Sequence, residues 1–186
     1  SYIHRCQKDG VKIVMNCEVT PELIKEEKPD SVIIATGSKT LILPIEGIDN
    51  PAIIHGSDLL DGKRAAGKKV LVVGGGMVGC ETAAFLGEQE HDVTVIEFRD
   101  TVGADVIHEH RVYLMKDFED YGIKEITGAK VCKFYEDGVE YETADGVRHE
   151  TRGYDSVILS MGFRNYNPLE EKIKDLVPET HVIGDA

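Results

Sequence analysis

The chain lacks the features that define several large classes of protein. Its 186 residues contain no tryptophan, six prolines and four cysteines. No apolar run approaches the roughly 18 residues that a membrane-spanning helix needs, and the first ten residues are too polar for a secretory signal peptide. We therefore expect a protein without membrane segments, located in the cytoplasm.

Positive charge is also scarce. The 21 lysines and arginines are outnumbered by 34 aspartates and glutamates, which gives a formal net charge of -13. Binding to nucleic acid or to an anionic lipid surface needs clustered lysine or arginine, because the attraction is electrostatic. We expect neither nucleic acid nor a membrane surface as a partner.

The cysteines and histidines do not have the spacing of a metal or disulfide site. No CxxC or CxxxxC motif joins any of the four cysteines, which are Cys6, Cys17, Cys80 and Cys132. Cys80 falls in an apolar, helix-like stretch, which is typical of a buried and unreactive thiol. His108 and His110 are two residues apart, so they point to different sides of a helix, and no third ligand is evident. We predict no metal site.

Short runs of consecutive apolar residues predict parallel strands that are covered on both faces. The runs are residues 32–35, 70–73, 93–96, 157–159 and 182–183. Between the second and third runs, Val78, Thr82, Phe85 and Leu86 recur at helical spacing, so residues 77–89 are predicted to form a crossover helix. The fold class is therefore α/β, with at least one complete βαβ unit.

The segments that follow the third run predict a second helix, a strand and a meander. A helix over residues 105–121 would end at Gly122, and a strand would follow at 123–126. Residues 130–152 are rich in β-forming residues and contain Asp137-Gly138 and Asp145-Gly146, which favour tight hairpin turns. We expect a three-stranded antiparallel meander that covers the sheet.

A different unit precedes residue 51. Its pattern predicts a short helix that ends near Asp9, a strand at 11–14, a helix at 21–27 and the strand of the first apolar run. Residues 37–56 contain Pro44, Gly47 and Pro51 and are typical of a connection between lobes.

The sequence VLVVGGGMVG at residues 70–79 carries the clearest motif. It contains GxGxxG as Gly74, Gly76 and Gly79, directly after a predicted buried strand and at the start of a predicted helix. Gly74 permits the tight turn, Gly76 lets a pyrophosphate approach the backbone, and Gly79 lets the helix pack closely on the sheet. A glycine-rich turn without a ligand is the alternative that remains open.

The residues around this turn complete a predicted dinucleotide site. The backbone amides of Gly75, Met77 and Val78 belong to the turn and to the positive end of the helix. Glu97 lies 23 residues after Gly74, at the end of the next strand, where a carboxylate accepts hydrogen bonds from the adenosine ribose. We predict a Rossmann-type domain over roughly residues 65–162.

The choice of cofactor depends on the segment from Glu97 to Arg99, with Phe98 between them. The Glu97 carboxylate would repel the 2′-phosphate of NADP(H), which favours NAD(H). Arg99 is two residues later, and an arginine there is able to compensate the phosphate charge. We predict NAD(H), with NADP(H) as the open alternative.

Three further fragments extend the pattern beyond the Rossmann domain. They are Ala35-Thr36-Gly37, Met161-Gly162 and Gly184-Asp185-Ala186, arranged around a GGGxVGxE core. In this order the chain resembles flavoproteins with two dinucleotide-binding domains, in which an NAD domain is inserted into an FAD domain. The run EVTPELIKEEKPDSVIIATGS and the ending HVIGDA resemble the group of old-yellow-enzyme-related oxidoreductases that includes 2,4-dienoyl-CoA reductase, 2-enoate reductase and trimethylamine dehydrogenase.

The resemblance assigns further cofactor-binding residues. It implies that Ala35, Thr36 and Gly37 pass near FAD, and that Gly184 and Asp185 approach its ribityl and pyrophosphate region. It implies that Gly162 lies close to the nicotinamide nucleotide. For Glu81, placed in the first turn of the crossover helix, a position near the nicotinamide and simple stabilisation of the helix N-terminus are both open.

The resemblance also implies a domain plan. Residues 1–52 would be a partial FAD-binding lobe, 53–162 the NAD(H)-binding domain, and 163–186 the return to the FAD lobe. Only one GxGxxG unit is present, so we expect FAD to bind this chain weakly or not at all. The missing N-terminal domains of the same polypeptide would hold the rest of the FAD site, with FMN and an iron-sulfur cluster as possible further cofactors.

The function implied by this plan is electron input. NADH would pass hydride to FAD, and electrons would travel onward to reduce an activated double bond or a related substrate, while the isolated chain is expected to be inactive. No residue here is assigned as a catalytic acid, base or nucleophile, because positioning the nicotinamide does most of the work. Two alternatives remain: part of an NADH oxidase or a ferredoxin- or disulfide-reductase-type flavoprotein, and a non-catalytic NAD-sensing module.

Overall fold

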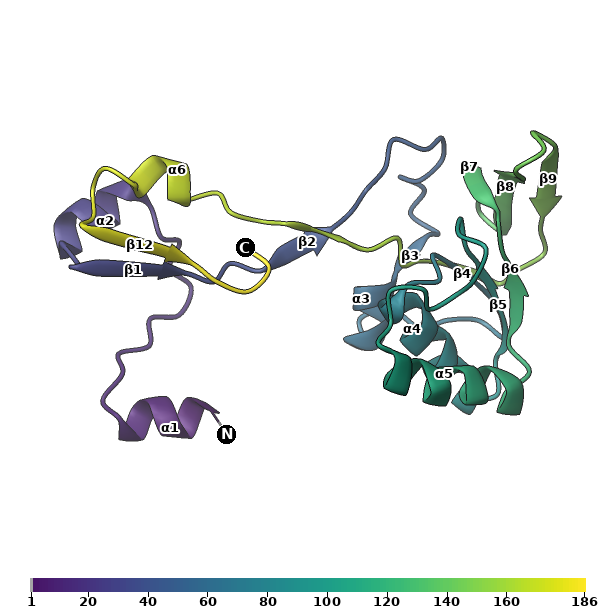
Figure 1. Ribbon diagram of the computed structural model, residues 1–186, viewed down its shortest axis with the longest axis horizontal. Coiled ribbons are helices and arrows are strands. Elements are labelled where there is room, and N and C mark those ends of the chain that lie inside the picture. The colour runs from purple at the N-terminus through teal and green to yellow at the C-terminus, as the bar shows by residue number, and fades with distance from the viewer. Residues whose placement is uncertain (1) are drawn as a thin grey trace. The chain divides into compact units, whose positions relative to one another are not determined.

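A computed structural model describes residues 2–186, which form two compact units (Figure 1). The central unit spans residues 40–163, and the terminal unit combines the residues up to 39 with residues 164–186. Residues 40–52, which the sequence assigned to the flavin lobe, pack with the central unit, because Ile45 and Ile48 join one of its hydrophobic clusters.

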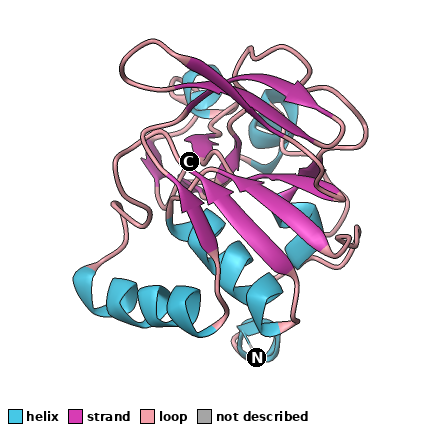
Figure 2. Cartoon of the chain, turned by 90° about the vertical axis from the view of Figure 1, so that its right-hand side faces the viewer, coloured by secondary structure: helices cyan, strands magenta, loops and turns pink. Residues whose placement is uncertain are grey.

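A five-stranded sheet forms the frame of the central unit (Figure 2). All of its strand pairs are parallel, as the consecutive apolar runs predicted. In spatial order the strands are β3 (Ile54–His55), β10 (Ser156–Leu159), β4 (Lys69–Val73), β5 (Asp92–Ile96) and β6 (Lys124–Ile126). The α/β fold class is confirmed.

Both faces of this sheet are covered (Figure 2). Helices α3 (Gly56–Leu60), α4 (Met77–Glu88) and α5 (His108–Asp120) pack on one face, where Val70 and Val72 meet Leu86 and Phe118. The meander of β7 (Lys130–Tyr135), β8 (Gly138–Glu142) and β9 (Arg148–Thr151) packs on the other face against Leu71 and Val73. Successive residues of β4 therefore serve opposite layers, which is why the strand is apolar at every position after Lys69.

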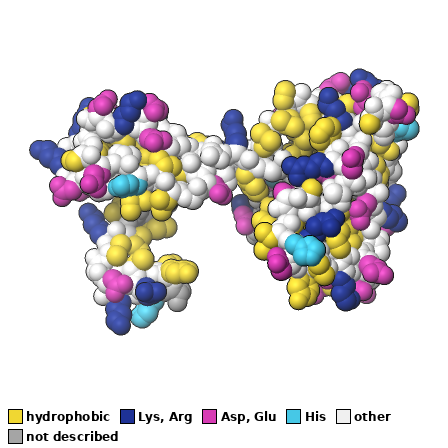
Figure 3. Space-filling model, viewed as in Figure 1, with side chains coloured by type: hydrophobic (Ala, Val, Ile, Leu, Met, Phe, Trp, Pro, Cys, Tyr) yellow, Lys and Arg dark blue, Asp and Glu magenta, His cyan; other side chains and the backbone are white. Residues whose placement is uncertain are grey.

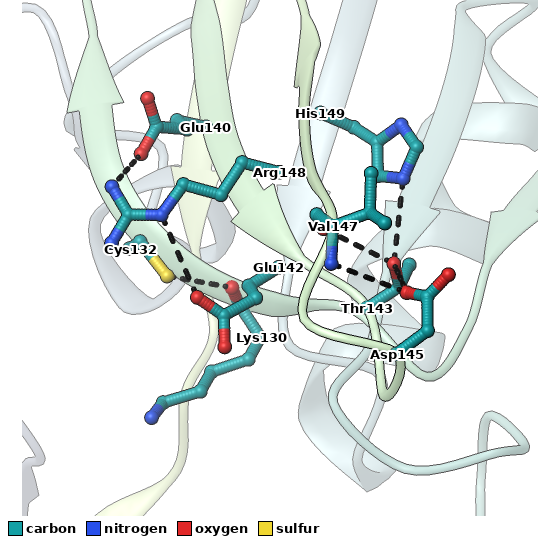
Figure 4. Close-up of polar contacts among 9 residues, drawn as sticks. All are labelled: Lys130, Cys132, Glu140, Glu142, Thr143, Asp145, Val147, Arg148 and His149. Atoms are coloured by element: carbon teal, nitrogen blue, oxygen red, sulfur yellow. Dashed lines mark hydrogen bonds and ion pairs between the residues drawn. The ribbon is translucent and has the colours of Figure 1, made fainter.

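The meander has the predicted strands and turns. Its outer surface carries ion pairs from Arg148 to Glu140 at 2.9 Å and to Glu142 at 3.5 Å (Figure 4). At the second turn, Asp145 Oδ1 accepts hydrogen bonds from the Thr143 hydroxyl at 2.6 Å and from the Val147 backbone N–H at 3.3 Å. These contacts hold the hairpin locally.

Helix α5 starts at His108, three residues later than the predicted start at 105. Residues 101–106 form turns and bends, and Gly103 adopts a φ of +64° there. The Gly103 N–H donates to the Gly75 carbonyl at 2.7 Å, so this loop is tied to the glycine-rich turn. The helix ends as predicted, because Gly122 follows it with a φ of +65°.

The terminal unit contains a parallel pair of strands, β1 (Ser31–Ile34) and β12 (Glu179–Val182). Its other elements are α1 (Tyr2–Lys8), α2 (Pro21–Glu27) and α6 (Glu170–Ile173), while β2 (Ser38–Thr40) and β11 (Phe163–Asn165) pair as a separate two-stranded sheet. Ile34 packs with Ile24, Ile173 and Val177. The last strand begins earlier than the apolar pair at 182–183 indicated. Its exposed Glu179 and His181 interrupt the apolar pattern, so the sequence did not indicate the start of the strand.

The strand predicted at residues 11–14 is wrong. These residues have no strand conformation, and Val11, Ile13 and Val14 are 52%, 47% and 58% exposed. A β-strand needs a partner for its backbone N–H and C=O groups, and no described strand pairs with this segment.

The surface of the central unit mixes both signs of charge on the face drawn in Figure 3, where basic and acidic side chains alternate with apolar ones. Across residues 2–186, no helix is both long enough and apolar enough to cross a bilayer. Within the same range, no three His, Cys, Asp or Glu side chains are grouped so that they could hold a metal ion.

Cys80 is fully buried in α4, and its thiol donates to the Gly75 carbonyl with an Sγ–O distance of 3.3 Å. Burial is the main cause that raises the pKa of this thiol to about 12. Because the thiolate is the reactive form, we expect Cys80 to resist alkylation in the folded protein while exposed Cys17 reacts. Iodoacetamide labelling followed by peptide mass spectrometry, with and without denaturant, checks this; fast native labelling of Cys80 would contradict it.

Candidate dinucleotide site

The turn after β4 requires glycine at two positions for steric reasons. Gly74 has a φ of +104°, and a Cβ there would lie 2.3 Å from the Ser160 carbonyl oxygen. A Cβ on Gly79 would lie 1.8 Å from the carbonyl oxygen of Gly74. The turn and the first turn of α4 are therefore packed backbone to backbone, which is the close approach that the motif predicted.

Helix α4 starts without a side-chain cap. Its N-cap residue is Gly76, no side chain accepts a hydrogen bond from the first turn, and that turn contains no acidic residue. The unpaired N–H groups and the positive end of the helix dipole therefore face outward at the carboxyl edge of the sheet, where they favour an anion.

Glu97 lies beside this helix start at the end of β5. Its Oε2 accepts a hydrogen bond from the Gly75 backbone N–H at 2.6 Å, and its Oε1 accepts one from the Arg99 backbone N–H at 2.8 Å. A carboxylate oxygen accepts two hydrogen bonds, so each oxygen keeps a free lone pair in a fixed position. The carboxylate is thus oriented by the backbone before any ligand arrives.

A cavity of about 450 Å³ joins these groups. It runs along the carboxyl edge past β5, β4 and β10, and its volume is in the range of small-molecule sites. Its walls are apolar apart from a few polar groups. The lining residues are Val73, Gly74, Gly76, Met77, Val78, Ile96, Glu97, Phe98, Arg99, Asp105, Ala129, Val131, Ser160, Met161, Gly162 and Phe163.

Eight of the predicted site residues line this one cavity, and Gly162 is distant in sequence from the other seven. The eight are Gly74, Gly76, Met77, Val78, Glu97, Phe98, Arg99 and Gly162. Gly75 and Gly79 do not line it. The Gly75 backbone N–H donates a hydrogen bond to the Glu97 carboxylate, and Gly79 allows α4 to pack closely on the turn. The residues present fit an extended dinucleotide, because a carboxylate fixed by the backbone and an uncapped helix start line a single cavity.

Glu81 is not in the first turn of α4, in contrast to the prediction. It is the fifth residue of the helix, and the dipole effect falls off within the first turn, so stabilisation of the helix N-terminus does not explain it. Its Oε1 lies 3.9 Å from Nε2 of His110 on α5, with both side chains 42% exposed. Glu81 does not line the cavity.

Sequence reasoning missed Asp105. This exposed carboxylate lines the cavity at the helix start, and a Cβ on Gly76 would lie 3.0 Å from its Oδ2. The loop that carries it is placed by the hydrogen bond from Gly103 to Gly75, which is a contact between segments far apart in sequence. No spacing pattern around Asp105 indicates this position.

Asp105→Asn is expected to raise the affinity for a dinucleotide about two- to five-fold. The carboxylate opposes a pyrophosphate at the helix start, and an exposed charge of this kind contributes about 0.3–1 kcal/mol. Titration calorimetry at low and high salt checks this, because screening should shrink the gain. Glu109→Gln removes the same charge outside the cavity and should have little effect; an equal gain from both variants would contradict a local role.

A second cavity, of about 490 Å³, shares Phe98 and Arg99 with the first. Its other lining residues come from neighbouring loops and from the meander, where Lys130, Glu142 and Thr143 lie close to the contacts drawn in Figure 4. Arg99 and Lys130 bring positive charge to it, and Asp100 and Glu142 bring negative charge.

In the terminal unit, two predicted segments meet at one edge. β1 and β12 are parallel neighbours, so Thr36-Gly37 and Gly184-Asp185 follow strands that end at the same side. The Ile183 N–H donates to the Ile34 carbonyl at 3.0 Å, and the Tyr166 N–H donates to the Gly37 carbonyl at 2.9 Å. Ala35 directly follows β1. The structure thus brings these residues together.

The fold and the cavity together define the dinucleotide-binding part of an oxidoreductase. The chain belongs to the pyridine nucleotide-disulphide oxidoreductase family, which matches residues 5–177. The cofactors of this family are FAD and NAD(H).

Several relatives narrow the classification within this family. A cinnamate reductase from Clostridium sporogenes is 31% identical over 180 residues, which cover 95% of this chain and 26% of the relative. An NADH oxidase from Thermoanaerobacter brockii is 33% identical over 182 residues, which cover 95% of this chain and 28% of the relative. A 2-naphthoyl-CoA reductase, solved with 2-naphthoyl-CoA, is 32% identical with a TM-score of 0.87, and the match covers 99% of this chain and 28% of that structure.

These relatives confirm the resemblance to the enoate and dienoyl reductase group. The chain spans about a quarter of the length of each of them.

Proposed function

We propose that this chain is the NADH-binding, electron-input part of a larger cytoplasmic flavin oxidoreductase that reduces an activated double bond or a related substrate. The observation that carries the proposal is the pairing of the Glu97 carboxylate, held by two backbone N–H groups, with the uncapped start of α4 in one cavity. Such a pair matches a ribose next to a pyrophosphate.

The preference for NADH follows from the same geometry. Both Glu97 oxygens are fixed by the backbone, so the carboxylate cannot easily turn away from an added 2′-phosphate. Arg99 bonds Glu97 through its backbone N–H, and within residues 2–186 no hydrogen bond or ion pair fixes its guanidinium beside that carboxylate. The fixed carboxylate therefore favours NADH, whereas compensation by Arg99 would require its unfixed guanidinium to be ordered against the 2′-phosphate.

The terminal unit supplies the proposed flavin contacts. Ala35, Thr36, Gly37, Gly184 and Asp185 lie where two parallel strands end, which is the edge at which open α/β sheets bind nucleotides. The nicotinamide would supply hydride and a flavin would accept it. The residues of this chain bind and orient the nucleotide, with further domains of the same polypeptide as partners.

The test is calorimetric titration of the 186-residue chain with NADH, NADPH and ADP-ribose in parallel. We expect NADH to bind at least several-fold more tightly than NADPH, because an uncompensated phosphate beside a carboxylate is repelled. Binding of NADPH equal to that of NADH would overturn the cofactor assignment, and absence of binding by all three ligands would overturn the proposed function.

A second candidate, part of an NADH oxidase, is favoured by the 33% identity to the Thermoanaerobacter brockii protein that bears this name. Both candidates use the same NADH site. Oxygen consumption by the complete polypeptide, measured with NADH in the presence and absence of an enoate such as cinnamate, separates them.

A further inference from the structure

The second cavity of the central unit, of about 490 Å³, has no role in the proposed dinucleotide site. Its volume is in the range of small-molecule sites. Its walls come from the loop after β5 at residues 98–100, from Gly128 and Lys130 around the start of β7, and from residues 142–144 at the end of β8. It shares only Phe98 and Arg99 with the first cavity, so the two are neighbours with separate linings.

Backbone hydrogen bonds fix the frame of this cavity. The Gly128 N–H donates to the Arg99 carbonyl at 2.9 Å. The Ala129 N–H donates to the Glu97 carbonyl, also at 2.9 Å. These two bonds tie the loop after β5 to the start of β7. Arg99 and Lys130 therefore extend from backbone segments that are held together before any ligand binds.

The charged side chains of the cavity differ in whether they have partners. Glu142 is paired with Arg148 at 3.5 Å. Within residues 2–186, the Arg99 guanidinium and the Lys130 ammonium make neither a hydrogen bond nor an ion pair, and no dashed line reaches the Lys130 ammonium in Figure 4. The Asp100 carboxylate makes no ion pair in the same range. The cavity thus offers two unpaired cations and one unpaired carboxylate.

This set of groups matches the two ends of a sugar phosphate. A phosphate monoester carries a charge of about −1.5 to −2 near pH 7, which suits two cations, and a guanidinium offers it paired donors. A carboxylate without a cationic partner accepts hydrogen bonds from hydroxyl groups, as Glu97 is proposed to do for the ribose. Phe98 and Ala144 add apolar surface beside the charged groups.

We propose that this cavity binds a sugar phosphate separately from the dinucleotide, with the phosphate on Arg99 and Lys130 and a hydroxyl on Asp100. Arg99 is the one lysine or arginine among the described residues that line the first cavity. A phosphate bound to Arg99 removes the cation that a 2′-phosphate needs, so it increases the preference for NADH over NADPH. This consequence rests on the proposed function, whereas binding of the sugar phosphate does not.

The direct test is calorimetric titration of the 186-residue chain with glucose 6-phosphate, and separately with glucose and with inorganic phosphate. Ionic strength is held constant, because interactions between exposed charges are screened by salt. We expect glucose 6-phosphate to bind about ten-fold more tightly than either partial ligand, because it uses both ends of the site. Absence of binding, or equally tight binding of inorganic phosphate, would overturn the proposal.

Two lysines of the same strand give a matched pair of variants. Lys130→Gln is expected to weaken glucose 6-phosphate binding about five- to ten-fold, because a charge-assisted hydrogen bond is lost. The Lys133 ammonium pairs with Glu46 at 2.6 Å and does not line the cavity, so Lys133→Gln should change the affinity less than about two-fold. An equal loss in both variants would show a response to net charge and overturn the assignment.

Titrations with both kinds of ligand test whether the two sites are separate. Glucose 6-phosphate should still bind to the chain saturated with NADH, and displacement of one by the other would overturn the proposal. Saturating glucose 6-phosphate should weaken NADPH binding about three- to five-fold and leave NADH binding unchanged. Equal weakening of both would place the phosphate at the start of α4 and also overturn it. If glucose 6-phosphate binds and neither nucleotide does, the proposed function fails while this site stands.

Discussion

Gly79→Ala is expected to destabilise the central unit by about 3 kcal/mol or more and to abolish dinucleotide binding. In a helix, alanine is favoured over glycine by about 1 kcal/mol, so propensity alone predicts a gain. The added Cβ, however, would lie 1.8 Å from the Gly74 carbonyl oxygen, a backbone atom that cannot rotate away. To avoid this overlap, α4 would have to move away from the turn and lose a buried contact. The cost of this overpacking outweighs the gain of about 1 kcal/mol from the helix propensity of alanine.

The measurement is chemical denaturation followed by circular dichroism, with NADH titration of the variant in the folded range. Gly87→Ala is the matched comparison in the same helix. A Cβ there would lie 2.8 Å from the Cβ of Tyr121, the C-cap of α5, so the end of that helix would have to shift, but the overlap is smaller than the 1.8 Å approach at Gly79. We expect a much smaller loss of stability; an equal loss in both variants would show that the Gly74 contact is not special.

The sequence predicted the frame of this site because its signals are local. Consecutive apolar residues indicated the strands, the helical spacing of Val78, Thr82 and Leu86 indicated α4, and the glycine pattern placed the turn between them. Each signal reflects neighbours in the chain or the two layers that cover a strand. Such constraints are visible in residue type and spacing alone.

The parts that could not be predicted depend on contacts between distant segments. Asp105 reaches the cavity because Gly103 bonds Gly75, and the Ser160 hydroxyl is accommodated because Gly56 has no Cβ to clash with it. The segment at residues 11–14 has strand-forming residues but no strand beside it. Contacts between segments that are distant in sequence, rather than local propensity, determine these three features.

Glu97→Ala is expected to weaken NADH binding about ten- to one-hundred-fold, the equivalent of about 1–3 kcal/mol. Two effects oppose each other. Removing a negative charge near a pyrophosphate favours binding, but this term is screened and small at the protein surface. Losing a carboxylate that is already oriented by Gly75 and Arg99 removes charge-assisted bonds to the ribose hydroxyls, and this term is larger.

The sign of the effect should differ between the two nucleotides, and this distinguishes a local role from damage to the fold. NADPH does not gain from the carboxylate, because its 2′-phosphate meets a negative charge, so Glu97→Ala should leave NADPH affinity unchanged or raise it. Parallel calorimetry with NADH and NADPH measures both. Glu88→Ala removes the same charge at the far end of α4 and should alter neither affinity. Equal weakening of both nucleotides by Glu97→Ala would mean that the carboxylate supports the glycine turn rather than the ribose.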